Sequence, residues 1–219
     1  MSIDIDHLVV AAHTLEQGAA WCEATLGVAP GPGGKHVGMG THNRLLAIGS
    51  AAFPKTYLEI IAIDPQAPPP GRPRWFGLDD AALQAGLRDR PRLLHVVARC
   101  TQIETTLAAL RALGFDAGKP VAAERATAQG LLRWRIAGRA DGQLLLGGAL
   151  PTLIEWSGVH PTEHLSASPL RLQALALGGL PAAVAEALGL QGVRLADEGP
   201  ALSARFDTPL GVVQLDSGV

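Results

Sequence analysis

The chain has 219 residues, a formal net charge of −2 at pH 7 and a sequence pI near 6.4. This balance gives no electrostatic reason to expect a nucleic acid or an anionic membrane surface as partner. The two cysteines cannot form a disulfide framework, and no signal peptide or membrane-spanning stretch is recognisable, so we expect a cytoplasmic protein that acts on a small molecule.

The first predicted unit covers residues 1–65 and consists of a strand, a helix and three further strands. DHLVVAA is typical of a buried strand, and LEQGAAWCEATLG of an amphipathic helix that ends at Gly27. HVGMG, NRLLAIG and TYLEIIAID predict the next three strands. GPGGKH before them predicts a turn, because it lacks residues that a phosphate-binding loop requires.

Residues 66–91 predict a linker followed by a connecting helix. DPQAPPPGRPRW is rich in proline, which removes backbone donors and cannot continue a sheet. Residues from about 79 to 90 predict the helix. These features separate the first unit from a second one.

The second and third predicted units repeat the element order of the first. In residues 92–160, LLHVVARC precedes the amphipathic helix IETTLAALRALG, and PVAAERA, LLRWRIAG and TLIEWSG follow as strands. In residues 169–219, LRLQALALG precedes PAAVAEALG, and VRLADE, LSARFD and GVVQLDS follow. An element order that repeats along the chain is typical of a fold built from repeated modules. We expect an α+β fold of two tandem βαβββ modules with curved mixed sheets around a shared cavity, plus a degenerate third module.

Two histidines and two glutamates occupy matching places in the first two units. His7 and His95 lie in the opening strands, and Glu59 and Glu155 in the closing strands. Since side chains alternate along a strand, Leu8, Leu58, Ile60, Val96 and Ile154 should face the helices. The two histidines and two glutamates should then share the opposite, concave surface.

A carboxylate among apolar strand residues requires a partner. Two neutral imidazoles and two carboxylates balance one divalent ion, and mixed nitrogen and oxygen ligands suit zinc, nickel, manganese, iron or cobalt. The alternative, a satisfied core histidine and a glutamate paired with arginine, is favoured for any one of these residues alone. Their repetition favours a metal site on His7, Glu59, His95 and Glu155.

This quartet, in paired βαβββ modules, resembles the metal site of the vicinal oxygen chelate superfamily, and within it the glyoxalase-like proteins. GGKHVGMGTHNRLLAIG followed by YLEII is similar to a less-characterised glyoxalase-like branch. The resemblance implies a glyoxalase/bleomycin-resistance-like fold and a metal-dependent lyase or isomerase. In that reading, Glu155 or Glu59 would be the catalytic base next to a substrate carbonyl. The chain departs from a minimal glyoxalase I by its proline-rich insert and its third unit.

Two other functions stay open at this point. One is a metal-free small-molecule-binding protein of the antibiotic-sequestering kind, which would need no ligand set. The other is a metal-dependent dioxygenase of the same superfamily, which would carry iron and consume oxygen. A homodimer also stays open.

Five further residues are candidates for substrate binding: Thr41, Asn43, Arg44, Arg133 and Arg135. HPTEH at residues 160–164 offers two histidines, but its proline makes a helical ligand face unfavourable. In the third unit, Gln173 and Gln214 stand at the ligand positions. They bring no charge, so we expect that unit to be structural.

Overall fold

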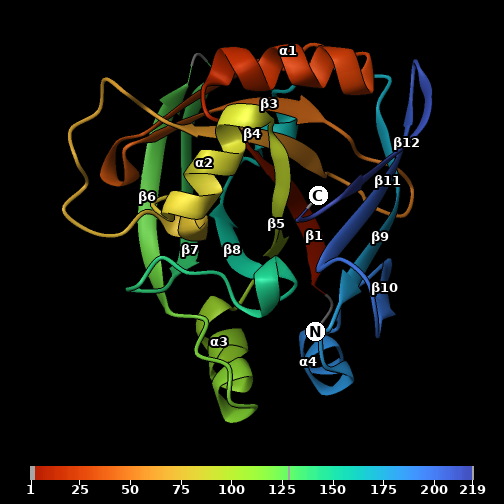
Figure 1. Cartoon of the computed structure of the whole chain (residues 1–219). Coiled ribbons are helices and arrows are strands. Elements are labelled where there is room, and N and C mark those ends of the chain that lie inside the picture. Colours follow the sequence, from red (N-terminus) through yellow and green to blue (C-terminus); the bar gives the residue numbers. More distant parts are fainter. Residues whose placement is uncertain (1–2, 128, 219) are drawn as a thin grey trace.

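The computed structural model describes residues 3–127 and 129–218. Its strands and helices follow one another in the predicted order, except that Val37–Met39 of the strand predicted at HVGMG forms a 3₁₀ helix, and the α+β fold class is confirmed (Figure 1). The elements of the first unit are β1 (Asp4–Ala11), α1 (Leu15–Leu26), β2 (Gly31–His36), β3 (Thr41–Ala47) and β4 (Tyr57–Ile63). Those that follow, up to the end of the second unit, are α2 (Ala81–Asp89), β5 (Arg92–Arg99), α3 (Ile103–Ala112), β6 (Lys119–Thr127), β7 (Gly130–Gly138) and β8 (Thr152–Ser157).

The first two units build one curved sheet. Its strand order is β2-β3-β4-β1-β5-β8-β7-β6, so each unit contributes four neighbouring strands. In both units the opening strand pairs in parallel with the closing strand, and β1 joins β5 in antiparallel fashion. The two edge strands, β2 and β6, also contact each other, so the sheet is nearly closed.

Two apolar clusters lie on the two faces of this sheet. The outer cluster packs α1, α3 and the third unit against residues such as Leu8, Leu58, Ile60 and Val96. The inner cluster lies on the concave face and contains, among others, Val9, Ala11, Ile61, Val97, Leu132, Trp134, Ile136 and Ile154. Four of the five residues expected to face the helices therefore do so, and Ile154 does not.

Local sequence explains where helix α1 begins and ends. The Thr14 side chain accepts a hydrogen bond from the backbone N–H of Gln17, which caps the first turn. Gly27 adopts the left-handed conformation with φ of 71°, which stops the helix where glycine has no steric penalty. The helix thus spans the stretch between two predictable signals.

The third unit has the predicted element order but a different strand pairing. It consists of β9 (Arg171–Gly178), α4 (Ala182–Leu188), β10 (Val193–Ala196), β11 (Leu202–Thr208) and β12 (Gly211–Asp216). Its separate sheet has the order β10-β9-β11-β12, so the opening strand pairs with the strand after the helix rather than with the last one. Gln173 and Gln214 donate to Asp207 and Asp216 on the exposed surface of this sheet.

Of the predictions for residues 79–90 and 31–36, the structure confirms the first and contradicts the second. The helix predicted near residues 79–90 is confirmed as α2, with Asp80 as its N-cap. The turn predicted at GPGGKH is wrong, because Gly31–His36 forms edge strand β2. Glycine is needed in this strand because a Cβ on Gly33 would overlap Asn43 of the neighbouring strand β3. A glycine-rich stretch can therefore be a strand wherever another chain segment approaches closely.

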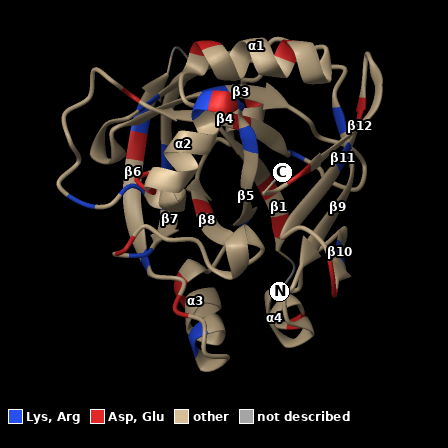
Figure 2. Cartoon of the chain, in the orientation of Figure 1, with Lys and Arg blue, Asp and Glu red and all other residues tan. Residues whose placement is uncertain are grey.

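Strand β6 carries charges of both signs, whereas the charged residues of helix α1 are all acidic (Figure 2). Over residues 3–127 and 129–218, no helix has the length and apolar character needed to span a membrane.

We expect Gly18→Ala to destabilise the protein by about 1–3 kcal/mol, the usual cost of overpacking a core. An added Cβ on this α1 residue would overlap Ile60 Cγ2 on β4, although alanine is the better helix former. Urea unfolding measures the difference. Gly38→Ala is the control, because nothing lies within 4 Å of a Cβ there. A Gly18→Ala protein as stable as the parent would show that α1 can move away from the sheet without loss.

Candidate active site

The concave face of the eight-stranded sheet bounds a mostly apolar cavity of about 630 Å³. A much smaller hollow of about 30 Å³ is lined by His7 and Glu59, among others. The cavity and the hollow share lining residues and are therefore adjacent; the shared residues are His36, Trp75, Phe76, Arg125, Trp134 and Ile136. A molecule in the cavity can thus place one end against the polar hollow.

A β-bulge in β1 brings the acidic and basic groups of the hollow together. Asp6 and His7 are sequence neighbours, so regular alternation would point them to opposite faces. The bulge between Ile5 and His7 breaks this alternation. His7 Nδ1 donates to Asp6 Oδ1 at 2.6 Å, and His7 Nε2 then faces Glu59 Oε2 at 3.7 Å. The longer distance is not a hydrogen bond, so both atoms can serve a bound molecule.

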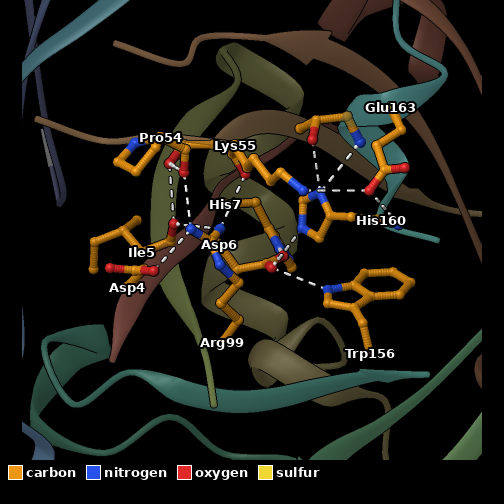
Figure 3. A network of polar contacts seen from close by, with 12 residues as sticks. Asp4, Ile5, Asp6, His7, Pro54, Lys55, Arg99, Trp156, His160 and Glu163 are labelled. Carbon is orange, nitrogen blue, oxygen red and sulfur yellow. Dashed lines mark hydrogen bonds and ion pairs between the residues drawn. The ribbon is translucent and has the colours of Figure 1, made fainter. Parts of the chain in front are cut away.

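The Asp6 carboxylate is fully buried and accepts hydrogen bonds from three side chains (Figure 3). Besides His7, the donors are Trp156 Nε1 at 3.0 Å and His160 Nε2 at 2.9 Å, both to Oδ2. Burial alone would raise the pKa of Asp6, but the hydrogen bonds from His160 and His7 outweigh it and hold the pKa well below its ordinary value. Asp6 is therefore an anion that fixes the imidazole of His7 from behind.

Asn43 on β3 fixes the Glu59 carboxylate. Its Nδ2 donates to Glu59 Oε1 at 2.5 Å and lies 3.3 Å from His36 Nε2. Its Oδ1 accepts from the backbone N–H of Gly34 at 2.8 Å and from Arg125 Nη1 at 3.3 Å. The amide is bonded on both sides, so it has one orientation and holds Glu59 in place.

His36, the last residue of β2, completes the polar wall of the hollow. Its Nδ1 donates to Thr41 Oγ1 at 3.0 Å, and its Nε2 lies 3.9 Å from Glu59 Oε1. Burial lowers the pKa of His36 to about 4, against the opposing effect of Glu59, and Arg125 lowers it further. His36 is therefore uncharged near neutral pH.

His95 occupies the place of His7 in the second unit but has different partners. A second bulge lies directly before it, at Leu94, where the first unit has Asp6. With no carboxylate there, His95 Nδ1 donates to the Gly148 carbonyl at 2.9 Å, and Nε2 accepts from Thr152 Oγ1 at 2.9 Å. Both ring nitrogens are thus bonded within the protein.

The register between β5 and β8 explains why Thr152 is the partner of His95 Nε2. In the first unit Val9 pairs with Glu59, and in the second unit the equivalent Val97 pairs with Thr152. The structural counterpart of Glu59 is therefore Thr152. Glu155 lies three positions further along β8, a shift that the similar motifs YLEII and LIEW conceal.

The prediction that Glu155 faces the cavity is wrong. Ile154 packs in the inner cluster, so Glu155 points to the outer face. There it pairs with Arg135 and accepts from the backbone N–H of Ile103, the first residue of α3, at 3.4 Å. The four predicted metal ligands do not meet, and among the described residues no group of three or more His, Cys, Asp and Glu is placed to hold a metal ion.

The prediction for the β7 arginines is also wrong. The apolar residues between them belong to the inner cluster, so the arginines point outward. Arg133 pairs with Glu124, and Arg135 with Glu104 and Glu155. The wall that β7 contributes to the cavity is consequently apolar.

Of the three β3 candidates, two lie on the inner face. Asn43 pairs across the strands with Ile61 of the inner cluster, and Thr41 contacts His36 as described. Arg44 pairs with Ile60 of the outer cluster, so it faces away from the cavity. Arg44 is therefore not a candidate for contact with a molecule in the cavity.

The structure adds five residues that the sequence reading did not assign: Asp6, His36, Arg125, Trp156 and His160. A signal existed for Asp6, because an acid in the middle of an apolar strand needs a partner. His160 belongs to HPTEH, where it caps a short 3₁₀ helix rather than presenting a ligand face. Its contact with Asp6 joins positions 154 residues apart and leaves no local pattern.

We expect the stability of the protein to decrease as the pH falls from about 6.5 towards 4. Burial lowers the pKa of His95 to about 3 from its ordinary value of 6.5, against the opposing effect of the hydrogen bond to the Gly148 carbonyl. Above 6.5 neither state binds the extra proton; below it the unfolded chain does and the folded chain does not. Each such histidine costs at most about 1.4 kcal/mol per pH unit. Denaturant unfolding at a series of pH values should give a shallower slope for His95→Gln than for the parent, and identical slopes would contradict the assignment.

Comparisons with known proteins identify a family and a fold. A family model described as a glyoxalase-like domain matches residues 5–195. A hypothetical protein from Staphylococcus aureus superposes with a TM-score of 0.60 at 14% identity, over 99% of this chain and 86% of that chain. This likeness shows the fold. No curated protein matches the chain in sequence.

Two methylmalonyl-CoA epimerases resemble the chain more weakly. The enzyme from Streptomyces coelicolor gives a TM-score of 0.42 at 18% identity, over 71% of this chain and 96% of that chain. The enzyme from Mycobacterium tuberculosis gives 0.41 at 14% identity, over 74% and 91%.

Proposed function

Because the chain belongs to the glyoxalase-like domain family, we propose that it is a lyase or isomerase that moves a proton next to the carbonyl group of a small substrate. The observation that carries this proposal is the Asp6–His7–Glu59 arrangement at the end of an apolar cavity. A carboxylate and an imidazole that face each other without bonding are suited to general acid–base chemistry. The apolar walls favour a substrate of largely hydrocarbon character.

Glu59 is the proposed base. Its Oε1 is held by Asn43, which leaves Oε2 directed towards the hollow and His7. In the proposed step Oε2 takes the proton from the carbon next to the carbonyl. The electron pair of that C–H bond forms a C=C bond, and the carbonyl oxygen takes the negative charge of an enolate.

His7 is the proposed second proton carrier. Asp6 holds its Nδ1 proton, so Nε2 can accept the proton from Glu59, and the buried anion stabilises the imidazolium that results. His7 can then return the proton to a different substrate atom, which completes an isomerisation. If the next carbon bears a leaving group, the enolate electrons expel it and the imidazolium protonates it, which completes an elimination.

A divalent zinc, nickel, manganese, iron or cobalt ion was expected on four ligands, and these residues do not fit one. His95 has both ring nitrogens bonded, and Glu155 lies on the other face in an ion pair. Glu59 and His7 remain, and among the described residues no group of three or more His, Cys, Asp and Glu is placed to hold an ion. A metal ion therefore takes no part in the proposed step.

The same cavity also suits a protein that captures a ligand without chemistry. Its volume of about 630 Å³ lies within the range of small-molecule sites, and most of its lining is apolar. In that case Glu59 and His7 would orient a ligand and move no proton. The two candidate functions differ in one measurable property, which is exchange of a substrate proton with solvent.

Proton NMR in heavy water tests the proposal. A panel of ketones, 2-oxo acids and hydroxy ketones is incubated with the protein, and loss of the signal from the proton next to the carbonyl is followed. We expect protein-dependent exchange with at least one class of compound, and no exchange above background with the Glu59→Gln variant. Compounds that bind without exchange in either protein would support capture alone and overturn the proposed catalysis.

A further inference from the structure

A cation lies where the apolar cavity meets the polar hollow. Arg125 on β6 lines both spaces, and its sequence neighbour Glu124, which lines the cavity alone, pairs with Arg133 rather than with Arg125. Among the described residues, Arg125 forms one side-chain hydrogen bond, which it donates to Asn43 Oδ1 at 3.3 Å. Within the same part of the chain no carboxylate forms an ion pair with Arg125. Its charge therefore lacks a direct counter-ion.

Unsatisfied donors at this junction point to a missing acceptor. Arg125 Nε is buried and has no hydrogen-bond partner among the described residues. Trp75 Nε1 is in the same condition, and Trp75 also lines both the cavity and the hollow. A buried donor without an acceptor costs free energy, and a guanidinium is best satisfied by a planar carboxylate.

The chain makes room for the Arg125 side chain at a specific point. A Cβ on Gly34 of β2 would lie 2.6 Å from Arg125 Cδ and 2.7 Å from its Nη1. A side chain at residue 34 would therefore compete with Arg125 for the space at the nearly closed edge of the sheet. Arg139, which also lines the cavity, differs because it pairs with Asp141 on the surface.

We propose that Arg125, together with the indole N–H of Trp75, binds a carboxylate of the substrate. The substrate class is then an apolar carbonyl compound that bears a carboxylate, with its hydrocarbon part in the large cavity and its reacting carbon near Glu59. The carbonyl group of this substrate rests on the proposed function, whereas its carboxylate rests on Arg125 and Trp75 alone. The anionic group determines specificity, and the hydrocarbon part supplies burial.

Binding of octanoate and its uncharged analogue octanamide tests the proposal without any turnover. Titration calorimetry, supported by the fluorescence of Trp75 and the other cavity tryptophans, measures both affinities. The parent protein should bind octanoate at least about tenfold more tightly than octanamide, the usual minimum for a charge-assisted hydrogen-bond pair. Arg125→Gln should abolish this preference and leave the octanamide affinity within about twofold.

Two further variants separate binding from folding. Arg139→Gln should keep the preference for octanoate, because that arginine already has a partner. Gly34→Ala keeps the charge but displaces the Arg125 side chain, so it should lose the preference while circular dichroism shows an intact fold. A parent protein without the preference, or an Arg125→Gln protein that keeps it, would overturn the inference. Preserved octanoate binding with no proton exchange in any assay would overturn the proposed catalysis alone.

Discussion

Replacing Glu59 by glutamine is expected to lower turnover about a hundredfold or more, the usual contribution of a general base. The glutamine carbonyl can still accept the hydrogen bond from Asn43 that the carboxylate accepts now. It cannot take a proton, so chemistry is lost while the shape of the hollow is kept. Thermal unfolding and circular dichroism of the variant should match those of the parent. A variant with full turnover on the substrate found by exchange screening would rule out Glu59 as the base.

Replacing Asp6 by asparagine is expected to cost about 3 kcal/mol of stability or more, the scale for removing one member of a buried charge cluster. An asparagine amide presents donor hydrogens towards some of the three donors that Asp6 now satisfies, so buried polar groups lose their partners. Turnover should fall as well, because nothing then fixes the imidazole of His7. Urea unfolding measures the first effect.

Asp4 provides the matched control for this change. It lies in the same strand, but its side chain is 41% exposed and pairs with Arg99 at the surface. Asp4→Asn should cost no more than about 1 kcal/mol, as exposed ion pairs do. Equal losses in the two variants would mean that the strand, rather than the buried cluster, is the sensitive element.

The stability that Asp6 provides also has a defined pH dependence. Its pKa in the folded protein lies below the ordinary value of 3.8, so its contribution is complete above that value and is lost only as the pH falls further. The decrease between about pH 6.5 and 4 belongs instead to buried histidines such as His95. The two effects can therefore be separated along one titration.

The fold was largely predictable because its signals are local and repeated. Alternation in the opening strands, the Thr14 and Gly27 ends of α1 and the proline-rich linker each depend on a few neighbouring residues. Strand β2 was missed because Gly33 and Gly34 are typical of turns, whereas the strand forms by pairing with β3, and Asn43 and Arg125 lie too close to these positions for a Cβ. The pairing of the third unit was missed for the same kind of reason, since element order does not determine which strands become neighbours.

The candidate site was predictable only in part. His7 and Glu59 could be selected as polar residues in matching apolar strands, and the structure places them face to face. The bulges before His7 and His95 and the register that sets Thr152 opposite Val97 depend on strand pairing, which no motif records. Because of these two features, the half of the site with His7 and Glu59 is polar and open to a bound molecule. The half with His95 is structural, although the sequence repeat makes the two halves look equivalent.

The Glu59→Gln and Glu155→Gln variants, measured side by side for proton exchange in heavy water, test whether the two halves really differ. Both residues occupy similar motifs, but Glu59 lies in the hollow with His7, and Glu155 lies on the outer face with Arg135. We predict that Glu59→Gln abolishes exchange and that Glu155→Gln keeps the exchange rate of the parent. Loss of exchange in both variants, with both proteins folded, would contradict a site built on Asp6, His7 and Glu59 and would support a centre that includes Glu155.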